Sequence, residues 1–135
     1  MGLISTLRVS SSGLSAERLR MDLIADNLAN ANTTRTPDGR PYQRKVAIFQ
    51  PITPTPSMPG GVRVAQIAAD STPLRMVYEP GHPDADANGY VAYPNVNIVH
   101  EMVDMITASR AYEANIQAFN AAKNMFMRTI DIGRV

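Results

Sequence analysis

The chain has 135 residues, of which 44% are hydrophobic and 19% charged, a length that fits one domain. Its 13 lysines and arginines nearly balance 12 aspartates and glutamates, and with this net charge of +1 the chain as a whole is not a polycation that binds nucleic acid. Because the chain has no cysteine, a disulfide scaffold, a thiolate zinc site and a cysteine nucleophile are also excluded.

The first twenty residues lack the apolar run of a secretory signal, because Ser5, Arg8 and the serines at 10–12 interrupt it. No stretch approaches about 18 consecutive apolar residues, so we expect no direct membrane insertion. If the protein leaves the cytoplasm, we expect it to use a route without a cleaved signal.

The prolines divide the chain, because all ten lie between Pro37 and Pro94. Proline disrupts helices, so both ends are free to be helical and the middle is not. The sequence predicts a mainly α fold with a small β insert (α+β), in which long N- and C-terminal helices pair in a coiled-coil-like bundle. We expect residues 1–36 and 92–135 to form a discontinuous terminal-helix assembly domain, and residues 37–91 to form a β-rich, proline-rich insert.

The N-terminal segment carries a heptad seam of Leu7, Leu14, Met21 and Leu28, with Ile24 on an adjoining row. Gly13 and the serines before it weaken the first turns, so the firm helix is expected at Ala16–Ala29, fading after Asn30. Asn27 and Asn30 near its end either bond the local backbone or pair their amides across packed helices.

The middle predicts three short strands, at residues 43–50, 62–68 and 74–79, and an extended or mobile loop at residues 50–61. Residues 34–63 carry five basic side chains and one acid, whereas residues 70–86 carry four acids and one arginine. These blocks either pair between neighbouring chains or remain solvated, which is the commoner outcome for surface charge.

A calcium-loop pattern begins at Asp84, with Asp86, Asn88 and Gly89 at its third, fifth and sixth positions. The twelfth position is Asn95 instead of glutamate, so we favour an acidic turn that pivots on Asn88 and Gly89. No other motif builds a pocket with a nucleophile or convergent ligands. We therefore expect no enzymatic activity, no catalytic residues, no cofactor and no metal site.

The C-terminal segment predicts a helix of about 35 residues. It begins near Pro94 with Asn95 or Asn97 as the cap and stops at Gly133. Ten positions follow a 4,3 spacing: Ile98, Met102, Met105, Ser109, Tyr112, Ile116, Phe119, Lys123, Phe126 and Ile130. Such a helix spans about 52 Å and does not fit inside a compact globule of this size, so the subunit should be elongated and covered by further chains.

Three segments resemble one known family. Residues 18–36, with Asn-Leu-Ala-Asn at Asn27–Asn30, resemble the signature of bacterial flagellar rod, hook and related axial proteins. Residues 38–45 and 78–125 are similar to rod proteins of the proximal rod. Together these segments cover well over half of the chain, in the family's order.

The resemblance implies a structural subunit of the proximal rod, the drive shaft of the flagellar basal body, that transmits torque. It makes the Asn27–Asn30 motif and the matching face of the C-terminal helix assembly residues, not catalytic ones. Combined with the heptad seams, the expected assembly interface consists of Leu7, Leu14, Met21, Ile24, Asn27, Leu28, Asn30, Met102, Met105, Arg110, Tyr112, Glu113, Asn115, Ile116, Phe119, Phe126 and Ile130.

The resemblance also implies the partners and the location. The partners would be other flagellar rod proteins, copies of the chain itself, the flagellar type III export apparatus and the base of the basal body. The chain would be exported without a cleaved signal and would assemble in the rod that crosses the periplasm. Two alternatives remain at this point: a cytoplasmic coiled-coil adapter that is similar to axial proteins only at its ends, and a weak calcium-binding module.

Overall fold

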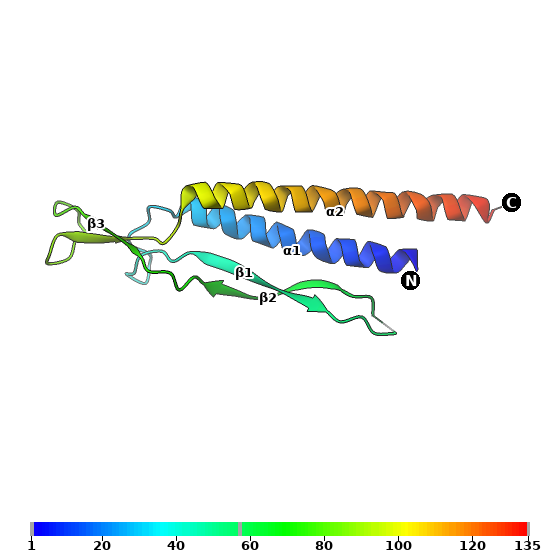
Figure 1. Ribbon diagram of the computed structural model, residues 1–135, viewed down its shortest axis with the longest axis horizontal. Helices are drawn as coiled ribbons and strands as arrows, with labels where there is room; N and C mark the ends of the chain where they lie inside the picture. Colours follow the sequence, from blue (N-terminus) through cyan, green and yellow to red (C-terminus); the bar gives the residue numbers. More distant parts are fainter. Residues whose placement is uncertain (1, 57, 135) are drawn as a thin grey trace.

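A computed structural model of the chain describes residues 2–56 and 58–134, and it shows an elongated molecule (Figure 1). Two antiparallel helices lie side by side, one β hairpin runs along them, and a second hairpin extends past their end (Figure 1). The elements are α1 (Leu3–Ala29), β1 (Lys45–Ile52), β2 (Gly61–Ala69), β3 (Arg75–Tyr78), β4 (Tyr90–Tyr93) and α2 (Ile98–Ile132). The predicted fold class, two long terminal helices with small sheets between them, is confirmed.

Helix α1 begins at Leu3, well before the expected Ala16, so the prediction of weak first turns is wrong. Tertiary contacts hold these turns in place. The Ser12 hydroxyl accepts a hydrogen bond from the Val62 amide of β2 (3.1 Å), and a Cβ on Gly13 would lie 3.0 Å from the Asn115 side chain of α2. Close packing against two elements therefore outweighs the low helix propensity of glycine and serine at this end.

Helix α2 has the predicted length and the predicted ends. It contains 35 residues, and its N-cap Asn97 accepts a hydrogen bond from the His100 amide (3.1 Å). Glu101 adds an acid to the first turn, and the helix stops before Gly133. The capping residues Asn97 and Gly133 therefore determine where this helix begins and ends.

The face of α2 that packs on α1 differs in register from the predicted seam. The buried and half-buried positions with a 4,3 spacing are Glu101, Met105, Ala108, Tyr112, Asn115, Phe119, Ala122 and Phe126. Of the predicted ten, only Met105, Tyr112, Phe119 and Phe126 belong to this set, whereas Ile98, Met102, Ile116, Lys123 and Ile130 are exposed. Small residues occupy buried positions on both helices: Ala108 and Ala122 of α2 and Ala16 of α1, while Gly13 of α1 lies against the Asn115 side chain.

The two sheets are separate antiparallel hairpins, β1–β2 and β3–β4. Strand β1 starts two residues later than predicted and continues through Pro51, part of the expected loop, to Ile52, with a bulge after Ile48. The third predicted strand is β3. Strand β4 was not predicted, because it is only 4 residues long and directly follows a turn-rich segment.

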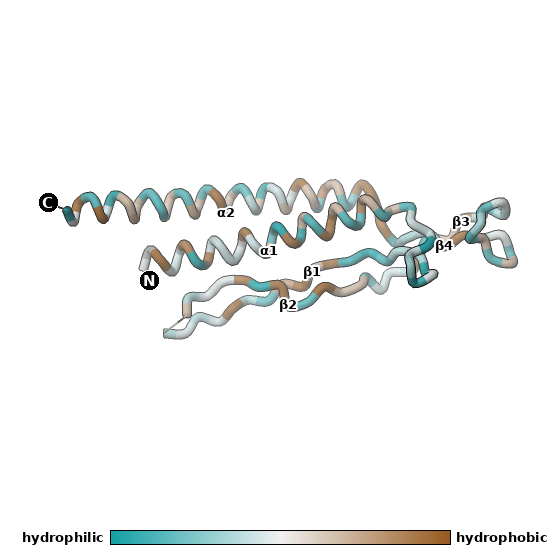
Figure 2. The backbone as a smooth tube through the Cα atoms, turned by 180° about the vertical axis from the view of Figure 1, so that it is seen from behind, coloured by the Kyte–Doolittle hydropathy of each residue, from teal (hydrophilic) through white to brown (hydrophobic). Residues whose placement is uncertain are grey.

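The core of the subunit is thin. Its buried hydrophobic residues are Ala16, Leu23, Ile24, Ala31, Tyr42, Val91, Ala108 and Ala122, of which four are alanine. Many large apolar side chains of α2 are exposed instead, and hydrophobic positions recur along the whole length of both helices (Figure 2). Within the described residues, no helix combines the length and hydrophobicity needed to cross a bilayer.

The small residues at the α1–α2 contact make a testable prediction. Ala108 has no exposed surface, so Ala108→Leu should overpack this contact and lower the free energy of unfolding by about 1–3 kcal/mol. Ala121→Leu makes the same change at an exposed position of the same helix and should alter it by less than about 0.5 kcal/mol. Urea denaturation of the purified chains measures both, and equal stabilities would show that Ala108 does not lie in the helix contact.

Candidate functional site

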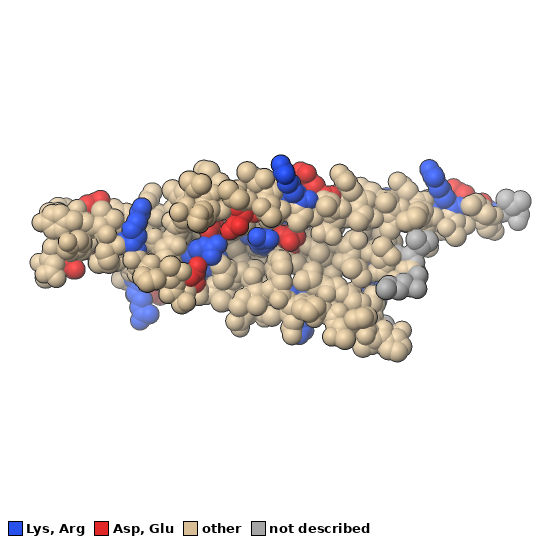
Figure 3. Space-filling model, in the orientation of Figure 1, with Lys and Arg blue, Asp and Glu red and all other residues tan. Residues whose placement is uncertain are grey.

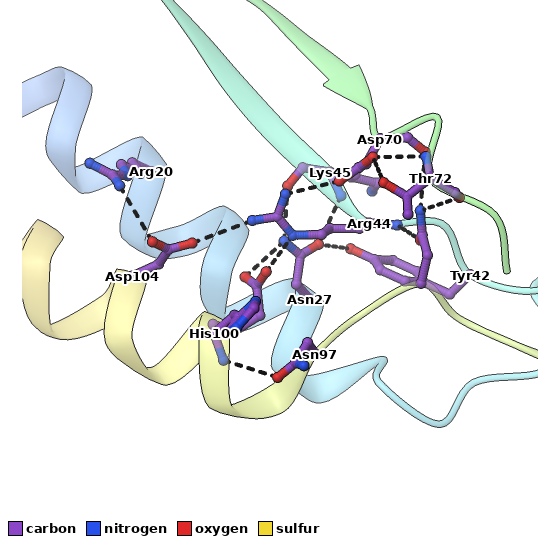
Figure 4. Close-up of polar contacts among 12 residues, drawn as sticks. Arg20, Asn27, Tyr42, Arg44, Lys45, Asp70, Thr72, Asn97, His100 and Asp104 are labelled. Carbon is purple, nitrogen blue, oxygen red and sulfur yellow. Dashed lines mark hydrogen bonds and ion pairs between the residues drawn. The ribbon is translucent and has the colours of Figure 1, made fainter. Parts of the chain in front are cut away.

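A group of polar side chains lies where α1, α2 and the start of β1 meet (Figure 4). We call Asn27, Tyr42, Arg44, Asp70 and Glu101 the polar junction. Asn27 and Glu101 are 1% and 0% exposed, which is unusual for an amide and a carboxylate in so thin a molecule. Buried groups of this kind are stable only when their hydrogen-bonding capacity is filled.

Asn27 uses all of its side-chain hydrogen-bonding groups. Its Nδ2 donates to the Lys45 carbonyl (2.9 Å) and to Glu101 Oε2 (3.2 Å). Its Oδ1 accepts from the Tyr42 hydroxyl (2.9 Å) and from the Lys45 amide (2.9 Å). The amide therefore joins α1 to β1 and to α2, and this long-range role decides between the two interpretations of Asn27 left open by the sequence.

Arg44 connects three carboxylates. Its Nε donates to Glu101 Oε1, its Nη1 pairs with Asp70 Oδ2 (3.1 Å), and its Nη2 reaches Asp104 Oδ2 (3.4 Å). Burial alone would lower the pKa of Arg44, but the hydrogen bonds and charges of Glu101 and Asp70 outweigh it and raise the pKa. The guanidinium thus stays charged and holds α2 to the end of β2.

The backbone beside Arg44 is fixed as well. The Arg44 amide donates to Asn95 Oδ1 (2.8 Å), and Asn95 Nδ2 donates to the carbonyls of Asp70 (3.1 Å) and Thr72 (2.9 Å). Burial, followed by the charges of Asp26 and Glu101, raises the pKa of Tyr42, so its hydroxyl remains a donor. The segments before β1, after β2 and before α2 are therefore tied together at one point.

The junction is suited to holding elements together and not to catalysis. Its carboxylates already accept from arginine, amide or hydroxyl groups, and no group of three or more histidine, aspartate or glutamate side chains in the described part of the chain is arranged to hold a metal ion. Such a fully bonded network specifies one relative arrangement of its elements.

The calcium-like segment forms a turn. Gly89 has a φ of +83°, and the Asp86 carboxylate accepts from the amides of Asn88 (2.8 Å) and Tyr90 (2.9 Å). Asp84 instead pairs with Arg35 (3.0 Å). Asp84 and Asp86, the first two carboxylates of the calcium-loop pattern, therefore bind different groups: the Arg35 side chain and the backbone amides of the turn.

The two charge blocks predicted from the sequence pair within the chain. Arg35 of the basic block pairs with Asp84 of the acidic block, and Arg44 pairs with Asp70. From the sequence, these charges were expected either to pair between neighbouring chains or to remain solvated. For these two pairs the structure shows a third outcome, which is ion pairing within one chain. Figure 3 shows charged side chains of both signs gathered where the helices meet the hairpins.

The structure divides the residues expected at the assembly interface into two groups. Buried or half-buried within the subunit are Leu7, Leu14, Met21, Ile24, Asn27, Leu28, Asn30, Met105, Tyr112, Asn115, Phe119 and Phe126. Exposed on α2 are Met102, Arg110, Glu113, Ile116 and Ile130. Only Asn27 of these belongs to the polar junction, while Asn30 caps α1 by donating to the Asp26 carbonyl (2.9 Å).

Sequence reasoning missed Tyr42, Arg44 and Asp70 as functional residues. They lie far from Asn27 and Glu101 in the chain, and no periodicity relates them. One residue of the sequence pointed to the junction. Glu101 is an acid next to the predicted seam of α2, whose positions are mostly apolar, and a carboxylate buried at such a place needs a partner.

Known proteins match this chain both in two segments and over nearly its full length. A family model described as "Flagella basal body rod protein" matches residues 7–35, and one described as "Flagellar basal body rod FlgEFG protein C-terminal" matches residues 87–132. The chain is 49% identical to flagellar basal-body rod protein FlgC of Borreliella burgdorferi, with 98% of each chain covered. It is 43% identical to FlgC of Salmonella typhimurium over 99% of this chain and 100% of that one. FlgC of Bacillus subtilis is 39% identical, with 96% and 97% covered.

The chain belongs to the FlgC family of flagellar basal-body rod proteins. It is a structural subunit of the rod, as the resemblance of its sequence to flagellar axial proteins implied. Rod proteins assemble with one another. The matched segments contain most of α1 and all of α2, so Asn27 and Glu101 of the polar junction fall in the two family models, while Tyr42, Arg44 and Asp70 lie between them.

Asn27 provides the test of the junction. Asn27→Ala should lower the free energy of unfolding by about 2–4 kcal/mol, because Glu101 Oε2, the Tyr42 hydroxyl and the Lys45 backbone groups lose the hydrogen bonds that Asn27 makes with them. Asn32→Ala, at an exposed position, serves as the control and should change it by less than about 0.5 kcal/mol. If chemical denaturation gives similar values for the two variants, the junction is not needed to hold the elements together.

Asp70 predicts a dependence of stability on pH. Hydrogen bonds from Thr72, together with Arg44, lower its pKa in the folded chain below the usual 3.8. A lowered pKa stabilises the fold above the unfolded value, and this contribution is lost as the pH falls through the folded value. The free energy of unfolding should therefore decrease as the pH falls below the unfolded value of 3.8, and this decrease should be smaller in Asp70→Asn. Chemical denaturation at a series of pH values measures this decrease, and Asp38→Asn, at an exposed position, is the control. An equal decrease in the wild-type chain and in Asp70→Asn would refute the role given to Asp70.

Proposed function

We propose that this chain is a subunit of the proximal rod, in which its two helices pack against copies of itself and against other rod proteins. The chain reaches this position through the flagellar type III export apparatus and assembles in the part of the rod that crosses the periplasm. Its FlgC relatives support the rod as the place of assembly.

The observation that carries this proposal is the outward face of α2. Met102, Ile116 and Ile130 are spaced by two heptads each and are 54%, 37% and 43% exposed. Ser109 and Lys123 occupy the heptad positions between them, so large apolar side chains alternate with polar ones along this row. Exposed apolar side chains that recur at multiples of seven residues are a feature of helices that pack against another helix. Within the subunit α1 occupies the adjacent face, so this row is left for neighbouring subunits.

The polar junction supports the same function in a different way. A subunit that transmits torque has to keep its outer hairpin fixed relative to its helices. The junction and the bond between Ser12 and Val62 attach β1–β2 to α1 at two separated points. The subunit can therefore pass force from the helices to the hairpin without changing their relative position.

A charge placed in the exposed row tests the proposal. Ile116→Asp should abolish motility while secretion continues, because assembly would bury an unpaired carboxylate. The experiment expresses each variant in the native strain that lacks its own copy of this chain, and it measures swimming, secreted protein and rods in isolated basal bodies. Gln117→Asp is the control, because it places the same charge on an exposed neighbour outside the row and should retain most motility.

Each possible failure has a distinct meaning. Normal swimming of the Ile116→Asp strain would show that this row is not an assembly interface. Secretion of the wild-type chain by a strain without the type III export apparatus would show that export uses another route. Intact rods in a strain that lacks the chain altogether would contradict the proposed function itself.

A further inference from the structure

The β1–β2 hairpin exposes apolar side chains and carries little charge. Each strand contains one charged residue, Lys45 in β1 and Arg63 in β2, and Ile48 and Ile67 are 42% and 50% exposed. The hairpin is a two-stranded sheet in the described part of the chain, so each strand has an outer edge whose backbone groups face away from the other strand. An edge of this composition is a template for pairing with another chain.

Helix α1 covers the outer edge of β1 where the strand begins. The Lys45 amide donates to Asn27 Oδ1, and the Lys45 carbonyl accepts from Asn27 Nδ2 (2.9 Å each), so the backbone groups of Lys45 point away from β2. Backbone groups alternate in direction along an antiparallel strand. Those of Ala47, Phe49 and Pro51 therefore point to the same outer edge.

The partner of Pro51 in the ladder gives the same direction independently. Pro51 lies opposite Val62, and the Val62 amide donates to the Ser12 hydroxyl of α1 (3.1 Å) instead of to β1. The two residues are therefore a pair without hydrogen bonds between them, and the outward direction of Pro51 holds beyond the bulge that follows Ile48. At this level α1 contacts the outer edge of β2, and Pro51 on the other edge is exposed.

The middle of the β1 edge has unused hydrogen-bonding groups. Among the described residues, no hydrogen bond outside the β1–β2 ladder reaches the backbone groups of Ala47 or Phe49. Both residues line a groove of about 290 Å³ between this edge and α1, to which Leu23 and Ile24 also contribute. Two outward amides thus precede Pro51, and Pro51 holds the next outward position.

Proline removes a donor from this position. Because it has no N–H, a strand that pairs with the edge loses one hydrogen bond at Pro51, and proline within sheets is accordingly confined to edges and bulges. We propose that Pro51 prevents the β1 edge from pairing with the β1 edge of a second copy of the chain. The product that it prevents is a four-stranded sheet with a two-fold axis, because both copies would use the same edge. This pairing concerns the free subunit and is independent of the proposed function.

Hydrogen exchange of the wild-type chain tests whether the edge is open. The amides of Val46 and Ile48 face β2, whereas those of Ala47 and Phe49 face outward. In NMR spectra of the purified, isotope-labelled chain, the Ala47 and Phe49 amides should exchange at least about tenfold faster than the Val46 and Ile48 amides. Equal protection of all four amides would show that the edge is already covered, which would overturn the proposal.

Returning an amide to position 51 tests the proline itself. Pro51→Thr supplies the missing N–H on a residue that favours strands, and it should raise the association constant of the purified chain at least about tenfold in analytical ultracentrifugation. Pro54→Thr, the same change at an exposed position after β1, is the control and should leave the constant unchanged. In the Pro51→Thr dimer the Ala47 and Phe49 amides should become protected, and dilution should expose them again.

Three further results would overturn the proposal. Pro51→Thr would associate no more than the wild-type chain, Pro54→Thr would associate as strongly, or the new protection would lie outside residues 47–51. If circular dichroism shows that Pro51→Thr does not fold, Pro51→Ala returns the same amide with a smaller side chain and replaces it in the test. All of these measurements use the isolated chain, so a failure of the proposed function would leave them unchanged.

Discussion

The burial of one carboxylate, that of Glu101, constrains the rest of the subunit. An ionised group removed from water costs several kcal/mol unless charged and hydrogen-bonding partners replace the lost hydration. Arg44 and Asn27 supply these partners, and they come from the segment before β1 and from α1. The carboxylate is therefore satisfied only when α1, α2 and β1 stand in one relative position. Desolvation offsets much of the attraction within a buried ion pair, so its net contribution to stability is small, whereas removing one partner is costly.

The hairpins depend on this arrangement, because a two-stranded sheet is marginally stable alone. Strand β1 begins at Lys45, whose backbone amide and carbonyl both bind Asn27, so the junction fixes where the hairpin starts. Farther along, Val62 of β2 donates to Ser12 of α1, which fixes the hairpin again near its turn. The long hairpin follows α1 because its two ends are anchored there, and its direction comes from these polar contacts more than from a large apolar core.

Local chemistry made part of the fold predictable. Ten prolines confined the strands to the middle, and Asn97 and Gly133 marked the ends of α2. The contact face of α2 was not predictable, because heptad spacing identifies a periodicity but does not choose between two adjacent registers, and we chose the one with larger apolar residues. The structure instead buries Ala108 and Ala122, whose small side chains carry little of the hydrophobic signal that a sequence pattern detects. The junction escaped prediction because its members meet only after folding.

This choice of register has a consequence for function. Alanines are buried in the helix contact, whereas many isoleucine, valine and methionine side chains of α2 are exposed, so the single subunit leaves much of its apolar surface in contact with water. Burying each such side chain contributes about 1.5–3 kcal/mol, so covering several of them would contribute an amount comparable to the net stability of a small domain, about 5–15 kcal/mol. The polar junction fixes the arrangement of the elements in the single subunit, and on the proposed function the apolar surface of α2 is covered by neighbouring subunits. A rod built in this way would have much of its hydrophobic core between chains, and its stiffness would then depend on the assembly more than on the single subunit.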